Sequence, residues 1–360
     1  MGKIRPFIKE DIPQLVNLHP RVFEDSNRPS SAYFEEVFLN DPWFDESIPS
    51  LVFEEDNGKI TGFLGVIPRR FSFKRRTIQA AITSQLMVDP LNRSAMAGLQ
   101  LLKTFLAGPQ DLSIADLTTF ETREVWKVFK SHTMWLYSMR WKRFLRSSST
   151  RRVQSLLRKC KLSALSKPFC PALEAFEERI RGRGLRPKAP QVSEVEISEN
   201  TIVAHLPEFV SSQFLRPEYD ERSLKWLLER AAKKLFGKLQ KVGVRNGAGE
   251  VIGWYIYYLN PGGEGKVLHI AAKQNSLKDV LDSLFYHAWQ AQANAVFGRL
   301  EPRFLAAPVS KIGISYHRIG CWAMFHARDP ELLSVIHRGD VFLTKLEGED
   351  LMHPLDEELE

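Results

Sequence analysis

The segment between Gln85 and Leu102 contains the residues best suited to bind an anionic cofactor. A strand with alternating apolar residues stops at Pro90, a short turn follows, and a helix then begins with Arg93 and several small residues. The first amide groups of a helix have no partner within it and carry the positive end of its dipole. Small side chains let a phosphate approach these amides, and an arginine adds attraction. The pattern predicts a pyrophosphate cradle, and an ordinary strand–helix junction is the alternative.

Regular elements must position this turn, and the chain alternates strand and helix signals on both sides of it. In the first part we predict strands at 3–8, 50–55, 59–73, 78–88, 112–117 and 133–137, and helices at 11–23, 32–39, 93–107 and 122–130. In the second part we predict helical structure over 201–236 with a break at Pro217, and a long helix over 277–297. The strands predicted there lie at 240–245, 251–259, 266–272, 304–307 and 322–325.

A short internal repeat indicates that the two parts share one architecture. Gly58-Lys59-Ile60-Thr61-Gly62-Phe63 is similar to Gly249-Glu250-Val251-Ile252-Gly253-Trp254, and each copy lies at the turn of a predicted hairpin. A further strand and then a helix follow each hairpin. We therefore favour a duplicated fold and predict domains at 1–147 and 193–360, joined by a basic helical linker at 148–192.

The order of motifs over about residues 3–140 resembles the GNAT N-acetyltransferase superfamily. In its acyl-CoA loop pattern, Arg/Gln-x-x-Gly-x-Gly/Ala, Arg93 fits the first position and Gly98 the last, while Met96 replaces the middle glycine. The resemblance implies an α/β (α+β) fold with two GNAT-like lobes, each a mixed, mostly antiparallel sheet flanked by helices. The second lobe is degenerate, because the turn after residue 272 has neither glycine nor arginine.

The resemblance also implies a cosubstrate, acetyl-CoA or another acyl-CoA, and the residues that bind it. The pantetheine arm would bind the backbone of Leu86, Met87 and Val88. The pyrophosphate would lie among Arg93, Ser94, Ala95, Met96, Ala97, Gly98 and Leu99. The strands that flank the thioester splay apart in this family.

Three residues are candidates for transferring protons during the reaction. Trp126 lies where many family members have a tyrosine that protonates the leaving thiolate, and an indole cannot do so. Tyr137 is the substitute candidate, and a packed aromatic side chain is its alternative role. Asp116 and Glu121 could act as bases through water, and capping and surface contacts are their alternatives.

Composition restricts the partners and the compartment. The net charge is +7, and residues 139–167 contain ten basic residues and no acidic one, so the rest of the chain is mildly acidic. We therefore expect no nucleic-acid binding. For the basic segment we favour a packed helix with solvated charges over contact with a membrane surface or an acidic partner. Three widely spaced cysteines and the absence of a His-x-x-x-His pair predict a cytoplasmic protein without a metal site. No apolar run is long enough to span a membrane.

Two functions remain open from the sequence. The first is acyl-CoA-dependent N-acyl transfer, most simply acetyl transfer. In that reaction, an amine that belongs to a small molecule or peptide attacks the thioester directly. The second is a catalytically inactive scaffold or binding protein with the same fold, which would engage an acidic surface through residues 139–167. Three residues motivate it: Met96, Trp126, and Thr119, which replaces an asparagine usual in the family.

Overall fold

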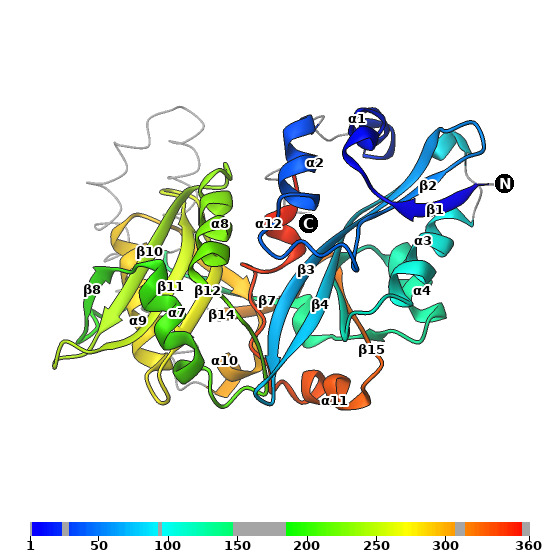
Figure 1. Cartoon of the computed structure of the whole chain (residues 1–360). Coiled ribbons are helices and arrows are strands. Elements are labelled where there is room, and N and C mark those ends of the chain that lie inside the picture. Colours follow the sequence, from blue (N-terminus) through cyan, green and yellow to red (C-terminus); the bar gives the residue numbers. More distant parts are fainter. Residues whose placement is uncertain (1, 24–28, 93–95, 147–184, 307–313, 355–360) are drawn as a thin grey trace.

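The computed structural model describes residues 2–23, 29–92, 96–146, 185–306 and 314–354. In these ranges the chain forms two mixed sheets with helices packed on their faces (Figure 1). Most neighbouring strands run antiparallel, which confirms the predicted α/β (α+β) fold class. The predicted basic helix within 148–192 lies almost entirely outside the described residues.

The first sheet has eight strands in the order β1-β2-β3-β4-β5-β15-β6, and β9 pairs with the end of β3. Among these strands, β4 and β5 form the parallel pair. The strands are β1 (Lys3–Pro6), β2 (Leu51–Glu54), β3 (Ile60–Phe73), β4 (Arg76–Val88), β5 (Leu112–Thr118), β6 (His132–Thr133), β9 (Leu215–Pro217) and β15 (Trp322–Ala327).

The second sheet has seven strands in the order β14-β7-β13-β12-β11-β10-β8, and its parallel pair is β12 with β13. The strands are β7 (Met139–Phe144), β8 (Ser193–Glu196), β10 (Lys238–Arg245), β11 (Val251–Leu259), β12 (Glu264–Ala272), β13 (Ala295–Arg299) and β14 (Ile314–Arg318).

Amphipathic helices cover both faces of each sheet. On the first sheet α1 (Ile12–Val22) and α2 (Ser31–Phe38) pack on one face, and α3 (Ala97–Leu106) and α4 (Phe120–Val128) pack on the other. On the second sheet α7 (Glu199–Phe209) and α8 (Glu221–Ala232) lie opposite α9 (Leu277–Gln290). The remaining helices are α10 (Pro302–Ala306), α11 (Pro330–Arg338), α12 (Glu349–Met352) and the 3-10 turns η1 (Lys9–Asp11), η2 (Pro90–Asn92) and η3 (Leu136–Ser138).

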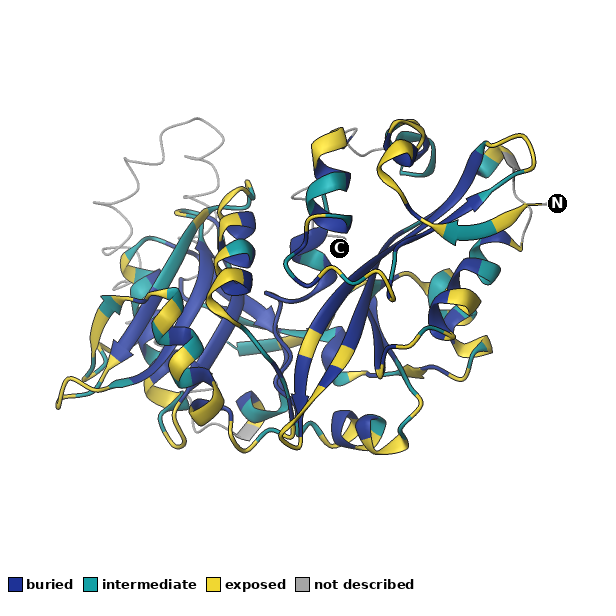
Figure 2. Ribbon diagram, viewed as in Figure 1, coloured by how far each residue is buried: buried dark blue, intermediate teal, exposed yellow. Residues whose placement is uncertain are grey.

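One hydrophobic core connects the two sheets. Leu15 of α1 and Phe34 of α2 belong to the same buried cluster as Leu206 of α7 and Leu227 of α8. Figure 2 shows the strands as the buried layer beneath helices whose outer faces are exposed. Burial of shared apolar surface stabilises the two sheets together rather than separately.

The same order of elements occurs twice, as the sequence repeat indicated. The series β1-α1-α2-β2-β3-β4-α3-β5 corresponds to β8-α7-α8-β10-β11-β12-α9-β13, with β9 inserted in the second copy. The repeated turns also match, because Gly58 and Gly249 adopt φ values of 80° and 81°. This left-handed conformation favours glycine.

Each sheet is completed by a strand from the other part of the chain. β7 lies between β13 and β14 in the second sheet, and β15 lies between β5 and β6 in the first. Strands from both sides of residues 148–192 therefore contribute to each sheet. The domain bounds at 147 and 193 remain a prediction.

Four predicted elements were wrong in type or extent. The helix predicted over 277–297 ends at Gln290, and β13 begins five residues later at Ala295. The strand predicted over 304–307 is part of α10, which begins at Pro302, a residue favoured in the first helical turn. Residues 201–236 form α7, β9 and α8 rather than one interrupted helix. The strand predicted over 133–137 ends at Thr133, and the next strand, β7, was missed among basic residues.

Candidate active site

An opening between two neighbouring strands is the central feature of the site. β4 and β5 pair in parallel from Ala80–Leu112 to Ile82–Ile114, and in the described chain no strand pairing joins them beyond that point. A bulge in β4 lies three residues beyond the last pair, at Gln85, which has φ 56°. The bulge turns the end of β4 away from β5, because an extra residue bends a strand and increases its twist.

The end of β4 and the start of α3 meet beside this opening. Gly98 lies close to Val88, because a Cβ atom added to the glycine would be 3.3 Å from Val88 Cγ2. Met96 is the N-cap of α3, but its side chain forms no capping hydrogen bond and is 53% exposed. The thioether therefore projects toward solvent, and the first turn of α3 lacks a side-chain cap.

The predicted cofactor residues are only partly described. Met87 and Ala97 are buried, whereas Leu86, Val88, Gly98 and Leu99 are half-buried. Arg93, Ser94 and Ala95 lie outside the described residues. The structure thus places Val88, predicted to bind the pantetheine arm, beside Gly98, predicted to bind the pyrophosphate.

Asp116 lies on β5 beyond the last β4 pair and is almost fully buried. Its Oδ2 atom pairs with Arg299 and lies 3.3 Å from Lys345 Nζ, and its Oδ1 atom accepts the Glu349 N–H at 2.9 Å. Burial alone would raise the pKa of Asp116, but the charges of Lys345 and Arg299 hold it below its usual value. These contacts favour a structural role over that of a base.

The other two candidate proton-transfer residues are Glu121 and Tyr137. Glu121 is exposed in the first turn of α4. Tyr137 is 1% exposed in η3, and its ring packs against Phe325. Burial raises the pKa of Tyr137, and its hydroxyl has no hydrogen-bond partner among the described residues. The structure does not join any two of the three candidates by a hydrogen bond or ion pair.

Trp126, which the family resemblance places at a tyrosine position, is a core residue. Its side chain is 1% exposed, and its ring packs edge-on against Phe105 of α3 with centroids 6.2 Å apart. It belongs to the cluster between α3, α4 and the first sheet. Its buried position indicates that it packs in the core.

The carboxyl-terminal segment 341–353 lies against the opening, a contact that sequence patterns did not predict. Glu349 accepts the backbone N–H of Leu117 on β5 at 3.2 Å, and His353 Nε2 lies 3.2 Å from the side-chain amide of Gln85. Burial and the charge of Asp116 raise the pKa of Glu349 to about 8, and burial lowers the pKa of His353 to about 4. Local patterns cannot reveal such contacts, which join residues more than 200 positions apart.

Lys345 of the same segment and Arg303 of α10 occupy the corresponding opening of the second sheet. β12 and β13 pair only as far as Lys266–Phe297. Beyond this point the carbonyl of Leu268 accepts the Lys345 N–H at 2.9 Å, and the carbonyl of Ile270 accepts the Arg303 side chain. The backbone groups of β12 that a ligand would need are therefore bound by the chain itself.

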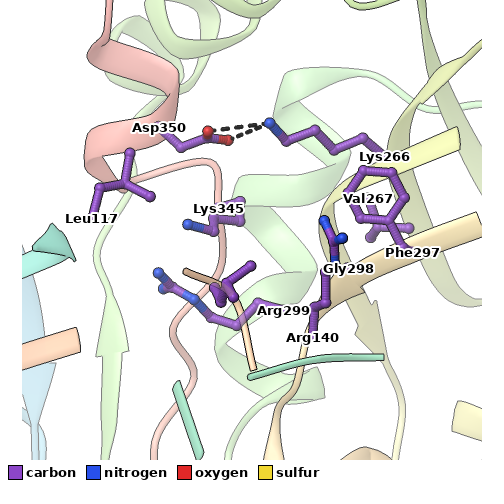
Figure 3. Close-up of a pocket in the computed structure, with 10 residues that line it drawn as sticks. Leu117, Arg140, Lys266, Val267, Phe297, Gly298, Arg299, Lys345 and Asp350 are labelled. Carbon is purple, nitrogen blue, oxygen red and sulfur yellow. Dashed lines mark hydrogen bonds and ion pairs between the residues drawn. The ribbon is translucent and has the colours of Figure 1, made fainter. Parts of the chain in front are cut away.

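A cavity lies between the two sheets, and Figure 3 shows the side chains that line it. Its volume is about 50 Å³, and Leu117 belongs both to its wall and to the diverging part of β5. The lining residues are Leu117, Arg140, Lys266, Val267, Phe297, Gly298, Arg299, Ile319, Lys345 and Asp350.

Comparison with known proteins identifies the first part of the chain. Residues 3–115 match the family model described as Acetyltransferase (GNAT) domain. These residues form a GNAT domain. The match covers β1 to β5, and so includes the bulged strand, the opening and the start of α3. It supports acyl transfer from an acyl-CoA as the class of reaction.

Solved structures similar to the whole chain carry the same fold. A protein from Enterococcus faecalis described as a probable N-acyltransferase is 10% identical, with a TM-score of 0.60 over 91% of this chain and 73% of that one. GCN5-related N-acetyltransferases from Anabaena variabilis and Kribbella flavida are each 12% identical. Their TM-scores are 0.57 and 0.54, over 92% and 91% of this chain and 74% and 72% of theirs. No curated protein matched the sequence.

Within the described ranges, no three His, Cys, Asp or Glu side chains gather as metal ligands. None of the helices in those ranges is long and apolar enough to cross a membrane.

Proposed function

We propose that this protein is an acyl-CoA-dependent N-acyltransferase that transfers an acetyl group from acetyl-CoA to an amine. The observation that carries the proposal is the divergence of β4 and β5 after Ile82 and Ile114, beside an N-terminus of α3 without a side-chain cap. Unpaired strand edges offer hydrogen bonds to an extended ligand, and a helix N-terminus attracts phosphate.

The proposed cosubstrate lies along the diverging end of β4. The backbone of Leu86, Met87 and Val88 binds the pantetheine arm, because strand pairing leaves this edge of β4 open toward β5. The pyrophosphate binds the first amides of α3, with Arg93 supplying a positive charge. The exposed Met96 side chain is compatible with this approach.

The proposed reaction is a direct attack on the thioester. The amine nitrogen forms a bond to the carbonyl carbon, the carbon–sulfur bond breaks, and the sulfur leaves as a thiolate that takes up a proton. Two effects lower the barrier: the protein positions the two reactants, and backbone N–H groups donate hydrogen bonds to the developing oxyanion. Tyr137 is the proposed acid because its hydroxyl has no partner among the described residues, although burial raises its pKa and so weakens it as a proton donor. Glu121 or Asp116 could receive the amine proton through water, although the ion pairs of Asp116 make it a weak base.

Calorimetric titration with acetyl-CoA tests the cosubstrate. We expect micromolar binding to the natural protein and at least about a tenfold loss with Arg93→Glu, because the new charge repels the pyrophosphate. Lys103→Glu is the matched control, since Lys103 is exposed in the last turn of the same helix. If acetyl-CoA and longer acyl-CoAs fail to bind the natural protein, the proposal is wrong.

The second candidate function is a non-catalytic scaffold. The burial of Trp126 and the ion pairs of Asp116 favour it, because two positions with possible catalytic roles serve packing instead. A scaffold that binds acetyl-CoA would release no thiol with any amine. Release of free CoA in the presence of a panel of amines, measured with a thiol reagent, would exclude this candidate.

A further inference from the structure

The cavity between the sheets is rich in positive charge. Arg140, Lys266, Arg299 and Lys345 line it, whereas Asp350 is its one acidic lining residue (Figure 3). Asp116 adds a second carboxylate beside the wall through its pairs with Arg299 and Lys345. Four cations thus face two carboxylates.

The two carboxylates do not use all the donors of Lys345 and Arg299, although Arg299 also donates to the carbonyl of Thr344 at 3.2 Å. Asp350 binds Lys266 at 2.9 Å, so that pair is complete. Lys345 is about nine-tenths buried and donates one side-chain hydrogen bond, to Asp116, although an ammonium group carries three donors. The Nε atom of Arg299 is buried and has no partner among the described residues.

Buried cations with unused hydrogen-bond donors are costly, and an anion offsets the cost when it accepts the open hydrogen bonds. The remaining walls, formed by residues such as Val267, Phe297 and Ile319, are apolar. They raise the strength of an ionic contact by excluding water. A volume of about 50 Å³ accommodates several water molecules or one small charged group.

We infer that this cavity binds the carboxylate of the acceptor, so that the substrate is an amine that also carries a carboxylate, such as an amino acid. The inference rests on the proposed function, because Leu117 connects the cavity to the opening proposed for the thioester. A carboxylate held by Lys345 and Arg299 leaves the amino group of the same molecule free to reach along β5 toward that opening.

Direct binding tests the cavity without acetyl-CoA. The probes are butyrate and its neutral analogue butyramide, titrated into the full-length protein at low salt and followed by ligand-observed NMR. We expect butyrate to bind at least tenfold more tightly than butyramide. Lys345→Met should reduce butyrate binding at least tenfold, whereas Lys278→Met, which removes an exposed lysine of α9, should not change it.

A second variant keeps the test valid if Lys345→Met does not fold. Ile319 lines the cavity and is half-buried, so Ile319→Glu introduces a carboxylate beside the same cations. The folded Ile319→Glu protein should no longer bind butyrate, because its own carboxylate occupies the site. Equal binding of butyrate and butyramide, or unchanged butyrate binding in both cavity variants, would overturn the inference.

Acetyl transfer tests the link to the acceptor. With acetyl-CoA, free L-amino acids should release CoA at least tenfold faster than the corresponding amino-acid amides. Equal rates would show that the cavity does not select the acceptor. Failure of acetyl-CoA to bind would overturn the proposed function alone, because butyrate binding is measured without it.

Discussion

At the junction of the sheets, two adjacent acidic residues have pKa values shifted in opposite directions. Cations keep the pKa of Asp116 low, whereas burial and the charge of Asp116 raise the pKa of the adjacent Glu349 to about 8. Near neutral pH the cluster therefore contains one ionised and one mostly protonated acid. This arrangement limits the repulsion that two buried carboxylates would otherwise suffer.

The raised pKa of Glu349 gives stability a pH dependence. The folded-state pKa is about 8 and the ordinary value is 4.5, so unfolding releases a proton between these pH values. The contribution of this residue to the free energy of unfolding therefore falls as pH rises from about 5 to 8. Glu349→Gln removes the titration and keeps an acceptor for the Leu117 N–H. We compare the free energy of unfolding of the variant with that of the natural protein at each pH. We expect this difference to be more favourable to the variant at pH 8 than at pH 5, by about 1 kcal/mol or more.

Urea unfolding at pH 5 to 8 measures this difference. Glu229→Gln on the exposed side of α8 is the control and should leave the pH dependence unchanged. Parallel stability curves for Glu349→Gln and the natural protein would contradict the assignment.

Among the elements, the β3–β4 hairpin determines the geometry of the opening. Gly65 of β3 pairs with Ser84 at the edge of the bulge. A Cβ atom there would lie 2.4 Å from Phe38 Cε1 and 2.7 Å from the carbonyl oxygen of Ser84. The close contact of α2 with the strand thus requires a residue without a side chain.

Substitution of this glycine should disturb both stability and the site. We expect Gly65→Ala to lower the free energy of unfolding by about 1–3 kcal/mol, because the methyl group displaces α2 or β4. Acetyl-CoA affinity should fall as well, since the bulge follows Ser84. Chemical denaturation and calorimetry measure the two effects. Gly247→Ala is the control, because a Cβ atom there meets nothing within 4 Å. A folded Gly65→Ala protein with unchanged stability would refute the packing argument.

Local sequence patterns predicted these hairpins and not the elements formed by distant pairing. The alternation in β3, β4 and β11 and the turns at Gly58 and Gly249 are properties of short segments, so their prediction succeeded. β7 was missed because it presents basic residues in alternation with apolar ones, and Arg143 is buried in it. The cluster of Asp116 with Arg299 and Lys345 joins three remote segments, which no local pattern can reveal.

At the scale of the whole molecule, strand exchange makes each sheet depend on both parts of the chain. The fragment 1–147 would contain β7 without its partners β13 and β14, and would leave β5 without β15. Unpaired strand edges and an incomplete core oppose independent folding.

We therefore expect the fragment 1–147 alone to show no cooperative thermal transition by circular dichroism. The full chain should unfold in a single transition. When co-expressed with the fragment 185–360, the first fragment should copurify with it, because the exchanged strands can pair again. A cooperative transition of fragment 1–147 near the midpoint of the full chain would show that the parts fold independently.

The two copies of the repeated architecture differ at the opening between their parallel strands. In the second sheet, the Lys345 N–H and the Arg303 side chain bind the carbonyl groups of Leu268 and Ile270. An extended thioester arm would have to displace these two groups. They belong to the same chain, so their effective concentration is very high. Under the proposed function, a titration should thus saturate at one molar equivalent per polypeptide, despite two copies of the fold.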